Sequence, residues 1–189
     1  MTDLVDNPRL LPDPTPAKVD YTIISVDDHL VEPPGMFEGR LPSRFQDRAP
    51  KVVVNEHGHE VWEYEGERFT QVGMNAVAGR KKSMKNFEST RFADMRKGCW
   101  DIHERVRDMD LNGVWASMNF PSMITGFCGR VFAQVEDKEL GFATTQAWND
   151  WLHDEWWQPA KDRIIPLGLT YLADPERGAA EIRRNAARG

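Results

Sequence analysis

The sequence predicts an α/β fold in which helices cover a parallel sheet, and three observations support this. Strand-like apolar runs at 21–26, 114–120 and 163–170 alternate with segments of helical periodicity. The runs are nearly continuous in apolar residues, as is typical of parallel strands buried on both faces. No G-x-G-x-x-G motif follows the first run, which argues against a dinucleotide-binding domain. This pattern leaves two architectures open, a doubly wound sheet and a (β/α)₈ barrel.

The composition bounds the class of function. With 189 residues, 40% hydrophobic and 29% charged, the chain fits one soluble domain with a real core. A net charge of −6 argues against a nucleic-acid partner. No apolar run approaches the roughly 18 to 20 residues that span a bilayer, and the acidic N-terminus is no secretory signal. Cys99 and Cys128 form neither a disulfide framework nor a zinc motif. We therefore expect a cytoplasmic protein that acts on a small molecule.

Two segments stand outside the alternation of strands and helices. Residues 1–20 hold four prolines among acids, which predicts an extended leader that is disordered or lies on the domain. The domain itself is expected over 21–189, with an insertion at 34–100. That insertion contains two β-prone runs, 51–55 and 60–64, on either side of a glycine turn, which indicates a hairpin. Residues 70–98 have no clean period and are expected to form a long covering loop.

The remaining elements have recognisable ends. Asp101 begins a capping pattern before a periodic segment, and Gly113 ends it just ahead of the second strand. A stripe of apolar residues over 140–152 indicates an amphipathic helix. Asp174 and Pro175 supply an N-cap and a first-turn proline for a last helix. Helical packing also accounts for the tryptophans of this region, Trp148, Trp151, Trp156 and Trp157.

The candidate site is where the first strand ends, at Asp27-Asp28-His29. Side chains alternate along a strand, so Asp27 and His29 are expected on one face and Asp28 on the other. A carboxylate and a neutral imidazole both bind Zn²⁺ or Mn²⁺, which makes this pair a plausible start to a metal site. The alternative is that the acids only cap or begin a turn. Other histidines are expected at a hairpin turn, on a helix surface or in a structural role: His57, His59, His103 and His153.

The segments around this pair form a longer sequence pattern: Val26-Asp27-Asp28-His29-Leu30-Val31-Glu32-Pro33-Pro34, then Leu41-Pro42-Ser43-Arg44-Phe45 and Asp47-Arg48-Ala49-Pro50. It resembles the metal-dependent amidohydrolase superfamily, in particular the amidohydrolase-related branch that includes aminocarboxymuconate-semialdehyde decarboxylase. Later segments agree, so the resemblance covers 21–189. It implies the N-terminal portion of a (β/α)₈ TIM barrel, about three β/α units, with the inserted hairpin and loop after the first strand.

The resemblance also implies a chemistry. In that family the first strand ends in His-x-His or acid-x-His, and Asp27 and His29 stand at those places as ligands of Zn²⁺ or Mn²⁺. The implied reaction is hydrolysis of a small carboxylated or cyclic substrate, or its non-oxidative decarboxylation. The family's other ligands, a later histidine and a late aspartate, and the catalytic residues are expected beyond residue 189.

Barrel active sites lie at the C-terminal ends of the strands. Glu32, Asn119 and Thr170 follow or end predicted strands, so we expect them to line the substrate site or to support it from behind. An interpretation of another class stays open beside the enzyme. The chain is then a non-catalytic fragment or interaction subunit that lacks further ligands and is stable as a homo-oligomer or with a complementary half.

Overall fold

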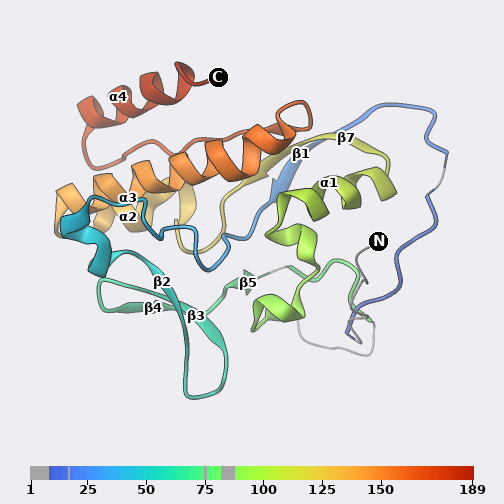
Figure 1. Ribbon diagram of the computed structural model, residues 1–189, viewed down its shortest axis with the longest axis horizontal. Coiled ribbons are helices and arrows are strands. Elements are labelled where there is room, and N and C mark those ends of the chain that lie inside the picture. The colour runs from blue at the N-terminus through green and yellow to red at the C-terminus, as the bar shows by residue number, and fades with distance from the viewer. Residues whose placement is uncertain (1–8, 17, 75, 82–87) are drawn as a thin grey trace.

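A three-stranded parallel sheet lies at the centre of the fold, with its strands in the order β1-β7-β8. The computed structural model describes residues 9–16, 18–74, 76–81 and 88–189. Within them the strands are β1 (Ile23–His29), β2 (Lys51–Val54), β3 (Glu60–Tyr64), β4 (Glu67–Phe69), β5 (Gly73–Met74), β6 (Glu88–Ser89), β7 (Val114–Phe120) and β8 (Ile164–Ile165). The helices are α1 (Ile102–Leu111), α2 (Arg130–Gln134), α3 (Lys138–Trp151) and α4 (Pro175–Ala186), shown in Figure 1.

The parallel sheet and its helical crossovers confirm the predicted α/β class. Strand β1 pairs with β7 after a crossover that ends in α1, and β7 pairs with β8 after one that contains α3. The third strand is shorter than the expected 163–170. It stops at Ile165 because Pro166 has no N–H to donate to a neighbouring strand.

Helix ends follow the local signals in the sequence. The Asp101 carboxylate accepts from the backbone N–H groups of His103 and Glu104, which caps α1. Gly113 adopts a φ of +68° just after that helix, in the left-handed region that favours glycine. Asp174 caps α4 in the same way. None of the helices in the described part of the chain combines the length and apolar composition that crossing a bilayer requires.

The insertion contributes an antiparallel sheet of its own, β2-β3-β4, in which β2 and β3 pair as the expected hairpin. The loop after it forms the short pair β5-β6 and several 3₁₀ turns, and its residues 75 and 82–87 lie outside the described part. The described leader residues lie against this region: the Leu11 N–H donates to the Gly79 carbonyl at 2.7 Å, and Asp13 pairs with Arg96 at 2.6 Å.

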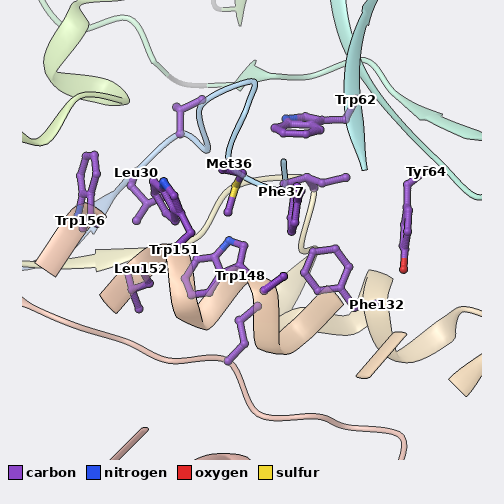
Figure 2. Packing of buried hydrophobic residues seen from close by; sticks show 14 of the residues in the cluster. Leu30, Met36, Phe37, Trp62, Tyr64, Phe132, Trp148, Trp151, Leu152 and Trp156 are labelled. Atoms are coloured by element: carbon purple, nitrogen blue, oxygen red, sulfur yellow. The ribbon is translucent and has the colours of Figure 1, made fainter. Parts of the chain in front are cut away.

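One apolar core joins the hairpin to the helices. Figure 2 shows the segment after β1, strand β3 and helix α3 meeting through large side chains. Phe37 packs edge-on against Trp62 and Phe132, with ring centroids 5.8 and 6.0 Å apart. The predicted packing role of Trp148, Trp151 and Trp156 is confirmed, since each is at most 1% exposed. The insertion therefore belongs to the same folded unit as the parallel sheet.

Candidate functional site

The C-terminal half of β1 carries an irregularity that sets the direction of its acids. Ser25 is the partner of Ser117 and Asp28 that of Asn119, so three steps along β1 match two along β7. The hydroxyl groups of Ser25 and Ser117 both donate to the Asp28 carboxylate, the first at 2.8 Å. Asp28 therefore faces the buried side of the sheet, where it anchors the end of β1.

His29 has its ring fixed by a backbone carbonyl. It is the partner of Phe120, with the two ring centroids 5.7 Å apart, and its Nδ1 lies 3.2 Å from the Pro121 carbonyl oxygen. A carbonyl only accepts, so Nδ1 carries the proton in the neutral imidazole and Nε2 keeps its lone pair. The Arg105 guanidinium also donates to the His29 carbonyl oxygen at 2.5 Å. The exposed ring thus offers Nε2 as a ligand atom.

Asp27 is exposed, like His29. Its carboxylate makes no hydrogen bond or ion pair with any residue in the described ranges. A carboxylate with free oxygens and an imidazole with a free Nε2 thus stand two positions apart at the end of a strand. This donor set fits Zn²⁺ or Mn²⁺, which bind carboxylate oxygen and neutral imidazole nitrogen.

Glu32 is fully buried just beyond β1. It accepts from the Ser122 backbone N–H at 3.0 Å, from the Ser122 hydroxyl, and from the Trp148 indole N–H at 3.1 Å. Burial raises the pKa of this carboxyl above its ordinary value, against the lowering effect of those donors. Of the two roles expected for Glu32, this arrangement favours support over direct contact with a substrate.

Asn119 is likewise inside the protein, 1% exposed near the end of β7. Its side-chain oxygen accepts from the Trp156 indole N–H at 2.9 Å, and its nitrogen donates to the Ser117 hydroxyl at 2.7 Å. These bonds continue the chain of contacts to Asp28 and so support the end of the sheet.

The sequence predicted that Thr170 ends a strand, but in the structure it does not. Strand β8 stops at Ile165, and Thr170 follows in an irregular segment where its half-buried side chain lies near Gly178 of α4. The cause is Pro166, which interrupts the ladder four residues earlier.

The other histidines do not join the pair. His57 and His103 are exposed, and His153 bonds through its Nδ1 to Asp154 at 2.7 Å. Among the residues that the structure describes, no group of three or more His, Cys, Asp or Glu side chains could hold a metal ion. Two clefts of about 370 and 430 Å³ are lined by other residues, Asp28 among them, but by neither Asp27 nor His29. This part of the chain therefore offers two ligands of a site that needs three or four.

The sequence could suggest Asp27 and His29 because strand alternation is local. It could not reveal the Pro121 carbonyl or the donors to Glu32, which lie some 90 or more residues away along the chain. The signal for Glu32 was its place between apolar residues and a proline pair, which marks burial without naming partners.

Comparisons with known proteins identify solved structures with a similar fold. No family model matches the chain, and no curated protein matches it. Among solved structures, it is similar to an amidohydrolase from Mycobacterium avium subsp. paratuberculosis K-10, with a TM-score of 0.67 and 21% identity over 91% of this chain and 48% of that one. The chain thus spans about half the length of that amidohydrolase.

A second solved structure is a 5-carboxyvanillate decarboxylase from Novosphingobium aromaticivorans DSM 12444, complexed with manganese and 4-hydroxy-3-methoxy-5-nitrobenzoic acid. The TM-score is 0.49 and the identity 19%, over 92% of this chain and 41% of that one. The similarity to the Mycobacterium avium amidohydrolase agrees with the fold that the resemblance implied. The chain has a mixed α/β fold with a parallel sheet, consistent with part of a TIM-like barrel.

Proposed function

We propose that Asp27 and His29 are two ligands of a divalent metal ion, Zn²⁺ or Mn²⁺, in an enzyme of the amidohydrolase type. One observation carries the proposal. The Pro121 carbonyl holds the Nδ1 proton of His29, which leaves Nε2 free, and the carboxylate two positions earlier in the sequence is one that no described residue engages. Asp27 and His29 are both exposed on β1, whereas Asp28 turns toward Ser25 and Ser117.

The protein's own groups have distinct tasks in this proposal. Asp27 and His29 hold the ion. Asp28, through Ser25 and Ser117, keeps the end of β1 in place, while Arg105 fixes the His29 main chain. When bound, the ion supplies Lewis acidity that polarises a carbonyl or carboxylate or acidifies a water molecule.

The proposed substrate is a small carboxylated or cyclic organic molecule, and the reaction is hydrolysis or loss of CO₂. Further ligands and the catalytic groups come from outside the described residues in this proposal. Glu32 and Asn119 act from behind the site, and the protein works in the cytoplasm.

Metal binding tests the proposal directly. We expect the purified chain to bind Mn²⁺ or Zn²⁺ in equilibrium dialysis. Asp27→Ala and His29→Ala should each weaken that affinity by about tenfold or more, because losing even a residue that supports a metal ligand typically has an effect of that size. The matched control is His103→Ala, which removes an exposed histidine on α1 and is expected to change nothing. Unchanged affinity in both site variants contradicts the proposal.

A second candidate function is that of an interaction subunit, and a specific observation favours it. Strand β1 is an edge strand within the described residues, and Ile24 and Val26 on it are 53% and 62% exposed. Exposed apolar side chains on an edge strand are a site for pairing with another chain. The proposed partner is a second copy of this chain.

A further inference from the structure

We propose that Glu32 is a positioning residue for the metal site, which it orients through the single peptide group that joins Pro121 to Ser122. The inference rests on the proposed function of His29 as a ligand. It goes beyond that function by naming a fully buried residue, away from the ion, that sets the direction of the ligand nitrogen.

The geometry places one rigid unit between the carboxylate and the imidazole. Glu32 accepts from the Ser122 N–H at 3.0 Å, and the Pro121 carbonyl accepts from the His29 Nδ1 at 3.2 Å. That N–H and that carbonyl are the two ends of the same peptide bond. A peptide group is planar, and no described peptide bond is cis, so the N–H and the C=O point in opposite directions. Holding one end therefore holds the other.

Further contacts make Glu32 a firm anchor for this peptide. The Ser122 hydroxyl donates to the second oxygen of Glu32, so Ser122 makes two hydrogen bonds to this carboxylate. The Trp148 indole N–H donates to the first oxygen at 3.1 Å, which ties the carboxylate to α3. With the side chain 0% exposed, water does not compete for these bonds.

A carboxylate is costly to bury unless hydrogen bonds compensate for the lost water, and three donors reach Glu32 here. An acceptor with two equivalent oxygens is what the two Ser122 donors require. The bond that the Ser122 N–H donates also polarises the peptide group, which strengthens the Pro121 carbonyl as an acceptor for His29. The result is a preference for the Nδ1–H tautomer, the one that leaves Nε2 available.

The test is ¹⁵N NMR of the His29 ring in the metal-free full chain, in alkaline buffer. We expect the Nδ1–H tautomer to dominate in the wild type. In Glu32→Gln we expect a larger fraction of the Nε2–H tautomer and a Mn²⁺ affinity about 10 to 100 times weaker. The ring of His103 serves as an internal reference and should not change.

Two variants keep the test decisive. Trp148→Phe removes the other donor to Glu32 but leaves Ser122 in place, so the His29 tautomer should stay as in the wild type. If Glu32→Gln fails to fold, Ser122→Ala serves instead. It removes one of the two hydrogen bonds from Ser122 to Glu32, and it should raise the fraction of the Nε2–H tautomer of His29 by a smaller amount. An unchanged tautomer in folded Glu32→Gln or Ser122→Ala overturns the inference. If the tautomer shifts but the wild type binds no Mn²⁺, the positioning stands and the proposed metal function fails.

Discussion

At the scale of single residues, the direction of each acid near β1 decides its role. Asp28 turns toward Ser25 and Ser117 inside the fold, whereas Asp27 and His29 are exposed with unused ligand atoms. The bulge between Ser25 and Asp28 interrupts the alternation that the sequence predicts, and it brings Ser25 and Asp28 to the same side of β1. The partners of Glu32 were not predictable, because tertiary packing brings Ser122 and Trp148 to it from distant segments.

The burial of Glu32 makes the free energy of unfolding depend on pH. Its pKa is raised by desolvation above the ordinary 4.5, so the folded state holds the carboxyl proton more tightly than the unfolded chain does. The contribution of Glu32 to stability is therefore fully present below about pH 4.5 and is lost as the pH rises through the raised value. We expect the unfolding free energy of the wild type, minus that of Glu32→Gln, to fall as the pH rises. Urea unfolding at a series of pH values measures it, and a constant or rising difference contradicts the assignment.

At the scale of elements, features set by neighbouring residues were predictable from the sequence, whereas features set by tertiary packing were not. The caps at Asp101 and Asp174 and the glycine after α1 are chemical signals within a few residues of the ends that they set. The π-helical turn at 152–157 was not predictable, since its place depends on how Trp156 packs against the sheet. The early end of β8 follows from Pro166, which has no N–H to donate to a neighbouring strand.

Helix α3 offers a test of packing against intrinsic propensity. Alanine favours a helix over glycine by about 1 kcal/mol, so propensity alone predicts that Gly141→Ala stabilises the protein. A Cβ at Gly141 would lie 2.3 Å from the backbone oxygen of Phe132 in α2, where a close approach leaves no room. We therefore expect a net loss of about 1 to 3 kcal/mol in the free energy of unfolding.

The control for this prediction is Gly35→Ala, where the nearest atom to an added Cβ is 3.5 Å away and belongs to a flexible glutamate. Its denaturation midpoint should stay close to that of the wild type. A Gly141→Ala protein as stable as the wild type, or more stable, would show that α2 and α3 are not packed this closely.

At the scale of the whole molecule, the fold is similar to that of a solved amidohydrolase over 48% of that protein's length. The sequence predicted the parallel sheet and its helices, but it could not say what covers the apolar side chains of β1. In a closed barrel, neighbouring strands and the barrel interior would enclose them.

Self-association follows from that exposed strand. We expect sedimentation velocity to show the chain as a dimer that dissociates on dilution, and Ile24→Lys to shift it toward monomer, because a charge on an edge strand opposes pairing. Ile182→Lys is the matched control, since Ile182 is similarly exposed on α4 at 58%. A wild type that stays monomeric across the concentration series excludes the second copy as a partner.

The most direct test of the central claim is the effect of Mn²⁺ on the histidine ring signals of the wild-type chain. Mn²⁺ is paramagnetic and broadens the NMR signals of nuclei close to it, so the ring of a ligand disappears first in a titration. We expect the His29 signals to broaden before those of His57, His59, His103 and His153, and Asp27→Ala to remove this preference. If His29 keeps sharp signals while another histidine broadens, Asp27 and His29 are not the metal ligands of this chain.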